Sequence, residues 1–193
     1  SDGELAYSRA GVSVVKSHYP FSRAYDLAED LCASARARIQ EIDPQRRVTA
    51  LDWHFAVNGL VRPLREIRSR EYSTPEGCLL MRPLRLQPLD HDWRTWQTFT
   101  KLVSAFREPK GGWSERRNKI IALREALRNG PEAVRHFLAV QPQPAERDEP
   151  VALPSIEGRP DMARQGWQGG ICGYFDVIEA LDFFVPLKGE ALP

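Results

Sequence analysis

Apolar residues first alternate with polar ones and then follow a helical repeat. Residues 6–20 alternate small and β-branched side chains and end at Pro20, which predicts a strand that leads into a helix. Residues 48–57 are apolar enough to form a second, buried strand. Between the two strands, one helical stripe is apolar: Phe21, Ala24, Tyr25, Ala28, Leu31, Cys32, Ala35 and Ile39. The sequence therefore predicts a strand, a helix and a strand, in this order.

The segment after this unit is rich in arginine. Residues 62–70 carry four arginines in a span that we expect to be a loop. Guanidinium groups suit phosphate, but we favour a solvated loop in which the arginines pair with Glu66 and Glu71. The apolar run at 78–81 predicts a short strand, antiparallel to an edge of the first sheet.

From Trp93 onward the apolar spacing is helical. Large aromatic residues share one face of the first helix, and we interpret them as core rather than as base-stacking platforms, because aromatic residues at helical spacing are usually buried. A second helix begins at Ser114 and ends at Asn129-Gly130, and Pro131 opens a third. Three helices with short joints predict a small helical bundle.

The second of these helices is strongly basic. Arg116, Arg117 and Lys119, together with Lys110 in the preceding loop, are the best candidates for contact with a nucleic acid backbone. Two glutamates dilute the charge, so a solvated helix face is at least as good an interpretation.

The last third of the chain changes character twice. Residues 141–170 are polar and rich in proline and glycine, which predicts a linker. Residues 171–193 contain a helical repeat, and we expect a C-terminal helix that packs back on the preceding domains. Asp176, Glu179 and Asp182 follow this helix, and we interpret them as a solvated face rather than as metal ligands.

Composition excludes several classes of protein. The 27 basic and 26 acidic residues give a net charge of +1, so the whole chain is not drawn to nucleic acid or to anionic membranes. No apolar run approaches the ~20 residues of a membrane span, and no signal-peptide pattern is present, which favours the cytoplasm. The three cysteines are widely separated, as expected of reduced thiols.

Two segments carry a resemblance to a known family. They are "Gly-Val-Ser-Val-Val-Lys-Ser-His-Tyr-Pro" at 11–20 and "Leu-Ala-Glu-Asp-Leu-Cys-Ala-Ser-Ala-Arg" at 27–36. Both resemble the end of the second palm domain in large subunits of type III CRISPR effector complexes and their stand-alone relatives. Weaker similarity extends to about residue 140.

The resemblance implies an α+β fold in four parts. We expect the C-terminal half of a ferredoxin-like palm at 1–88 and a helical domain at 89–140. The linker at 141–170 and the C-terminal helix at 171–193 follow. The helical domain would pack against other subunits of an effector complex.

The resemblance also implies a function in anti-phage defence. Palms of this family are nucleotide cyclases or polymerases that use ATP and Mg²⁺ or Mn²⁺. A lysine on their helix faces nucleotide phosphates, and Arg36 stands at the matching position. His18, at the joint between strand and helix, is a second candidate for nucleotide contact.

The metal-binding Gly-Gly-Asp-Asp hairpin of the family is missing from this sequence. We therefore expect the chain alone to be inactive and to need its own N-terminal half or another subunit. Two alternatives remain open. One is a noncatalytic scaffold or RNA-binding module that uses the basic helix, and the other is an unrelated α+β protein.

Overall fold

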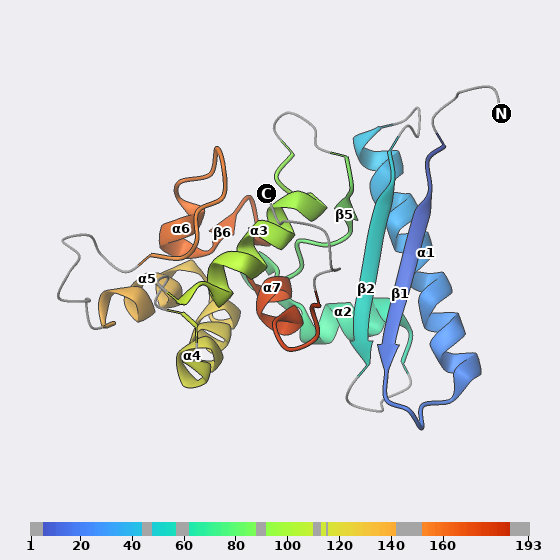
Figure 1. Cartoon of the computed structure of the whole chain (residues 1–193), viewed down its shortest axis with the longest axis horizontal. Coiled ribbons are helices and arrows are strands. Elements are labelled where there is room, and N and C mark those ends of the chain that lie inside the picture. The colour runs from blue at the N-terminus through green and yellow to red at the C-terminus, as the bar shows by residue number, and fades with distance from the viewer. Residues whose placement is uncertain are drawn as a thin grey trace. The chain divides into compact units, whose positions relative to one another are not determined.

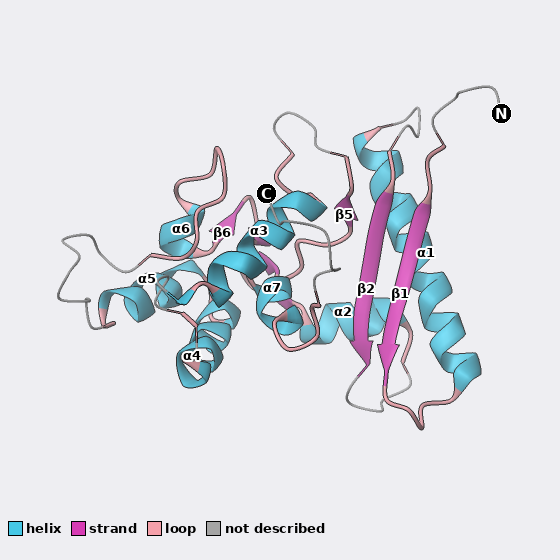
Figure 2. Cartoon of the chain, viewed as in Figure 1, coloured by secondary structure: helices cyan, strands magenta, loops and turns pink. Residues whose placement is uncertain are grey.

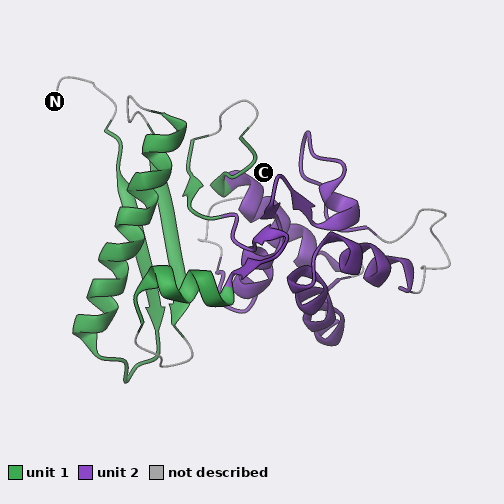
Figure 3. Cartoon of the chain, turned by 180° about the vertical axis from the view of Figure 1, so that it is seen from behind, with its two compact units in different colours: residues 1–71, 82–96 green, residues 72–81, 97–193 purple. Residues whose placement is uncertain are grey.

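The computed structural model describes residues 6–43, 48–56, 62–87, 92–109, 113–114, 116–141 and 152–185. Helices and strands are mixed along the chain, which confirms the predicted α+β class (Figures 1 and 2). The chain divides into two compact units (Figure 3). Unit 1 consists of residues 1–71 and 82–96, and unit 2 of residues 72–81 and 97–193. The division differs from the predicted boundary after residue 88, because residues 72–81 belong to unit 2.

Unit 1 is built on a three-stranded sheet with the order β1-β2-β5. β1 (Arg9–Val15) and β2 (Ala50–Ala56) are parallel, with Val12 opposite Trp53. The short β5 (Leu84–Arg85) pairs with β2 in the antiparallel direction. A parallel pair needs a long crossover connection, and α1 (Phe21–Ile42) is that connection. The predicted strand, helix and strand are all present.

α1 covers one face of this sheet, as the view from behind makes clear (Figure 3). Its buried residues are Leu27, Leu31, Ala35 and Ile39, at steps of four. The predicted stripe was too wide. Phe21 and Tyr25 are 83% and 54% exposed, because a helix turns by about 100° per residue and they lie to one side of the buried row.

The predicted arginine loop is a helix, α2 (Leu64–Glu71). Leu64 and Ile67 bury its apolar side. Glu66 forms ion pairs with Arg62 and Arg70, each four positions away, a spacing that stabilises helices. The predicted pairing with Glu66 is thus confirmed. The predicted loop was wrong, because only two apolar residues of the segment, Leu64 and Ile67, mark the buried side of the helix.

Unit 2 contains three consecutive helices: α3 (Trp96–Arg107), whose first residue belongs to unit 1, α4 (Arg117–Arg128) and α5 (Pro131–Ala139). Phe99, Val103 and Phe106 on α3 are buried, which confirms their interpretation as core. Gly130 joins α4 to α5 at a φ of 93°, a conformation that favours glycine.

Two small hairpins complete the sheet of unit 2. They consist of β3 (Ser73–Thr74) with β4 (Gly77–Cys78), and of β6 (Trp167–Gln168) with β7 (Ile171–Cys172). β4 and β7 are parallel, which gives the order β3-β4-β7-β6. The predicted strand at 78–81 was therefore placed in the wrong sheet. Leu79, Leu80 and Met81 follow β4 as buried residues outside any strand.

The predicted linker was wrong for the described residues 152–170. They contain the short helix α6 (Met162–Gln165) and strand β6. Four of their apolar side chains are buried, namely Leu153, Ile156, Met162 and Trp167. Their spacing has no helical or strand period, so periodicity could not reveal them. The part of the predicted linker at 142–151 lies outside the described residues.

The predicted C-terminal helix is short, α7 (Phe175–Ala180), and packs against α4 within unit 2. In the described part of the chain, no helix is both long and apolar enough to cross a membrane.

Candidate functional site

His18 lies in the turn that joins β1 to α1. It is exposed, and the turn is closed by a 2.9 Å hydrogen bond from the Tyr19 N–H to the Lys16 carbonyl. Arg36 is exposed near the opposite end of α1. At 1.5 Å per residue, roughly 22 Å of helix axis separates Arg36 from Phe21, the first residue after the turn. The structure therefore does not bring the two predicted nucleotide contacts together.

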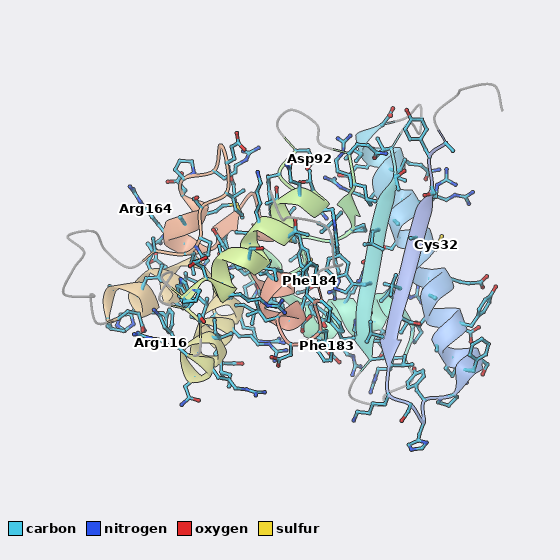
Figure 4. The ribbon with its side chains drawn as sticks, in the orientation of Figure 1. Cys32, Asp92, Arg116, Arg164, Phe183 and Phe184 are labelled. Carbon is cyan, nitrogen blue, oxygen red and sulfur yellow. The ribbon has the colours of Figure 1, made fainter. Side chains whose placement is uncertain are left out.

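Gly11 fixes the position of α1 over β1. A Cβ atom at this position would lie 2.2 Å from the Ala28 carbonyl oxygen and 2.5 Å from the Cys32 amide nitrogen. The Cys32 Sγ lies 3.7 Å from the Arg9 carbonyl oxygen (Figure 4 labels Cys32). Because α1 runs back along β1, Arg36, one turn beyond Cys32, belongs to the end of the helix that flanks the start of β1.

A buried group of charges ties α2 to the sheet. Asp52 on β2 is fully buried, and Nη2 of Arg68 donates to both of its carboxylate oxygens at 2.8 Å. Nη1 of Arg68 also donates to the Ser34 Oγ on α1, at 2.8 Å. Nε of the buried Arg82 lies 3.8 Å from the Asp52 Oδ1. We call Asp52, Arg68, Arg82 and Ser34 the Asp52 cluster.

The Asp52 cluster was missed at the sequence level. Its one signal is an aspartate inside the otherwise apolar run at 48–57, since a carboxylate there must find a partner when it is buried. The partners of Asp52 come from α2 and from the segment that precedes β5, and they could not be identified from spacing.

His54 lies next to this cluster on β2 and is also buried. The pKa of His54 is lowered to about 4, mainly by burial and less by the positive charges of Arg82 and Arg68, whereas Asp52 opposes the shift. His54 is therefore neutral at pH 7.

The predicted basic residues of α4 have different environments. Arg116 and Arg117 are exposed next to each other at the start of the helix, and Nη2 of Arg117 lies 3.7 Å from the Asp182 Oδ2 (Figure 4 labels Arg116). Nζ of Lys119 lies 4.1 Å from the centre of the Trp113 ring. Burial lowers the pKa of Lys119, with a smaller contribution from the charge of Arg116. Lys110 lies outside the described residues.

The second half of α4 is engaged within unit 2. The guanidinium carbons of Arg124 and Arg128 lie 5.2 and 4.7 Å from the centre of the Phe175 ring on α7. Arg124 also donates to Glu179 at 3.1 Å. The basic face that the sequence predicts is thus reduced to its first turns.

The acidic residues of α7 are not a solvated face. Asp176 is fully buried, and its Oδ2 accepts a 2.7 Å hydrogen bond from the Met81 N–H. Glu179 accepts from the Tyr72 hydroxyl at 3.2 Å as well as from Arg124. Asp182 is exposed as expected. The first two carboxylates hold unit 2 together, so the prediction was wrong for them.

The cysteines and carboxylates offer no metal centre in the described ranges. There, no group of three or more His, Cys, Asp or Glu side chains is placed to hold a metal ion. Cys32, Cys78 and Cys172 are free, which confirms the expected thiols, and burial raises the pKa of Cys172 to about 12.

No family model matches this chain, and no curated protein matches it.

Proposed function

We propose that this chain is the C-terminal part of a type III CRISPR-like large subunit that acts in anti-phage defence. In this proposal, unit 1 is part of a nucleotide-binding palm, and further strands complete the palm at the outer edge of β1. The open edge of β1 is the observation that carries the proposal.

β1 is the last strand of its sheet in the described part of the chain (Figure 2). The Ala50 N–H donates to the Ser8 carbonyl, so every second residue from Ser8 faces β2. The backbone groups of Gly11 and Ser13 consequently point away from β2. An edge of this kind is a template for another strand.

Exposed apolar side chains lie on both faces of the sheet near this edge, because Gly11 faces α1 and Val12 therefore points away from it. Val12 on β1 is 44% exposed, and Phe21 and Tyr25 lie on the same side of α1 as Ala28 and Cys32, which contact Gly11. Water-exposed aromatic residues beside an open strand favour a protein partner over solvent.

The sheet of unit 1 differs from half of a ferredoxin-like fold in the way its two parallel strands pair. Such a half contains a split β-α-β unit, whereas β1 and β2 pair directly. The proposal therefore adds the remaining strands outside β1 and leaves the β1–β2 pairing intact. Arg36 supports this arrangement, since it flanks the start of β1, where an added segment would meet the helix.

Divalent metal and ATP belong to the proposed palm, but the described residues do not fit a metal site. The carboxylates must then come from the added segment, and Arg36 remains the one predicted nucleotide contact that this end of unit 1 supplies. In the same proposal, unit 2 serves as the helical part that binds other subunits of the complex.

The test begins with the reading frame that encodes the chain. We expect it to continue upstream of Ser1 and to encode a Gly-Gly-Asp-Asp hairpin. The longer polypeptide should bind ATP in the presence of Mg²⁺ or Mn²⁺. It should lose its nucleotide cyclase or polymerase activity when the hairpin aspartates are changed to asparagine. A frame without such a hairpin would overturn the proposal.

The competing proposal is a noncatalytic RNA-binding module. Arg116 and Arg117 supply two exposed guanidinium groups at the start of α4, and salt-dependent RNA binding that is lost in R116E/R117E would favour it. The engagement of Arg124 and Arg128 with Phe175 leaves this function less support than the palm.

A further inference from the structure

We propose that Arg9 acts together with Arg36 as a two-arginine site for a polyphosphate, at the end of unit 1 where β1 begins. The inference rests on the proposed nucleotide-binding function and adds a residue to it. Arg9 was not among the sequence-predicted contacts. Its role follows from the register of the sheet.

The register directs Arg9 toward α1. Arg9, Ala50 and Arg85 are opposite one another on the three strands of the sheet. Residues that are opposite one another in a sheet point to the same face. Ala50 packs with Ala35 and Ile39 of α1, so this whole row faces the helix.

Arg36 lies on the matching side of α1. The 3.7 Å contact between the Cys32 Sγ and the Arg9 carbonyl oxygen places that turn of the helix beside Arg9. Cys32 and Arg36 are four positions apart, so they occupy one side of the helix in successive turns. Both guanidinium groups therefore belong to the same end of the helix-strand pair.

Neither arginine is neutralised by an acid in the described part of the chain. Nε of Arg9 is buried and has no hydrogen-bond partner there. The residues three and four positions from Arg36 carry no carboxylate: they are Cys32, Ala33, Ile39 and Gln40.

Arg38 on α1 and Arg85 on β5 provide the contrast. Arg38 lies 3.0 Å from Glu41 and 3.7 Å from Asp92, and Arg85 lies 3.8 Å from Asp92. Arg9 is partly buried and Arg36 is exposed. The buried Nε of Arg9 is costly without a partner, and that cost is offset when an anion binds. Nε and Nη1 of Arg85 also lack a hydrogen-bond partner, but the charge of Arg85 is compensated by Asp92. This difference assigns the anion to Arg9 and Arg36 rather than to Arg38 and Arg85.

Phosphate chemistry suits the pair. Two guanidinium forks offer several parallel N–H donors, which match the oxygens of adjacent phosphates better than a single carboxylate. A chain of phosphates spans two separate guanidinium groups, so tripolyphosphate is the simplest probe. It carries no base or sugar and reports on phosphate recognition alone.

The experiment is calorimetric titration of the 193-residue chain with tripolyphosphate, without metal, at low salt. We expect R9Q and R36Q each to weaken binding about tenfold or more, as for the loss of a charge-assisted hydrogen bond. The double variant should lose less than the sum of the two effects, because the arginines share one ligand. R9K should bind tripolyphosphate more tightly than R9Q and more weakly than the wild type, since lysine keeps the positive charge but lacks the forked N–H donors of the guanidinium group.

R23Q is the matched control, because Arg23 is an exposed arginine near the other end of the same helix; it should bind as the wild type does. Circular dichroism and thermal unfolding of every variant identify loss of fold.

Tripolyphosphate binding that is unchanged in R9Q, or equally weakened in R23Q, would overturn the inference and leave the palm proposal standing. Absence of any binding would overturn it as well. Binding that depends on Arg9 in a protein whose reading frame lacks the hairpin would retain the inference and reject the palm.

Discussion

Nη2 of Arg68 donates to both carboxylate oxygens of Asp52 at 2.8 Å, and this contact joins α2 to the middle of β2. Asp52 has no exposed surface, so its charge is stable only with its arginine partners. Arg68 also donates to Ser34 on α1, so this one guanidinium connects α2 with both β2 and α1.

The first prediction concerns this pair. D52N removes the buried carboxylate charge that Arg68 and Arg82 contact. Loss of one member of a buried ion pair typically costs about 3–5 kcal/mol. We expect a reduction of that order in the free energy of unfolding, measured by urea denaturation.

E66Q is the control for the same measurement. Glu66 pairs with Arg62 and Arg70 on the surface of α2, and exposed pairs contribute about 1 kcal/mol or less. Equal losses in D52N and E66Q would mean that the Asp52 cluster is not a principal source of stability.

The same cluster marks how far the sequence could predict unit 1. Hydrophobic period alone located β1, α1 and β2, because α1 and β2 each contribute buried residues to one core and β1 alternates partly buried and exposed positions over much of its length. The partners of Asp52 were beyond this method. Arg68 and Arg82 are 16 and 30 positions away in the chain, and no local pattern relates them to β2.

Unit 2 shows the complementary limit. The spacing of Phe99, Val103 and Phe106 predicted a buried helix face correctly. Strands of two residues are too short to show any hydrophobic periodicity. The carboxylates of Asp176 and Glu179 have a spacing that is typical of a solvent-exposed helix face. They are instead bonded to Met81 and Tyr72, a contact that depends on a segment about 100 residues earlier.

The candidate site was predicted only in part. Arg36 was found through a resemblance in the sequence, whereas Arg9 became a candidate through its register with Ala50. His18 was chosen because it lies at the joint between the strand and the helix, and this joint is at the opposite end of α1 from Arg36. The long helix α1 keeps His18 and Arg36 apart, although both belong to the segments that carry the sequence resemblance.

The second prediction is a pH dependence caused by His54. The pKa of His54 is lowered to about 4 in the folded protein, against ~6.5 in an unfolded chain. The unfolded state therefore binds more protons between these values, and stability should fall as the pH drops from about 6.5 to 4. The shift corresponds to a loss of up to about 3 kcal/mol.

Urea denaturation at several pH values between 7 and 4 measures this loss, and H54N should reduce the slope. An NMR titration of the His54 ring in the folded protein tests the cause directly. A midpoint above pH 6 in that titration would contradict the prediction.

The third prediction concerns the contact between Gly11 and α1. G11A introduces a Cβ atom 2.2 and 2.5 Å from backbone atoms of Ala28 and Cys32, which cannot move without displacing the helix. We expect a loss of about 3 kcal/mol or more in the free energy of unfolding. The comparison is G158A, where an added Cβ meets nothing within 4 Å and only the φ of +69° is unfavourable. That variant should lose about 1 kcal/mol, and a G11A variant as stable as G158A would contradict the close approach.

The fourth prediction addresses the open edge of β1. In the 193-residue chain, the amides of Gly11 and Ser13 point away from β2 and should exchange with solvent faster than those of Val12 and Val14, which face it. If further strands complete the sheet at this edge, the same two amides acquire hydrogen bonds. Hydrogen exchange followed by NMR should then show them slowed by at least about tenfold in the longer polypeptide, because each new bond must open before exchange.

Val12 and Val14 are the internal control, since they are already bonded to β2 in both proteins. Fast exchange at Gly11 and Ser13 in a longer polypeptide that is folded would mean that the added segment joins unit 1 elsewhere, and the palm proposal would lose the observation that carries it.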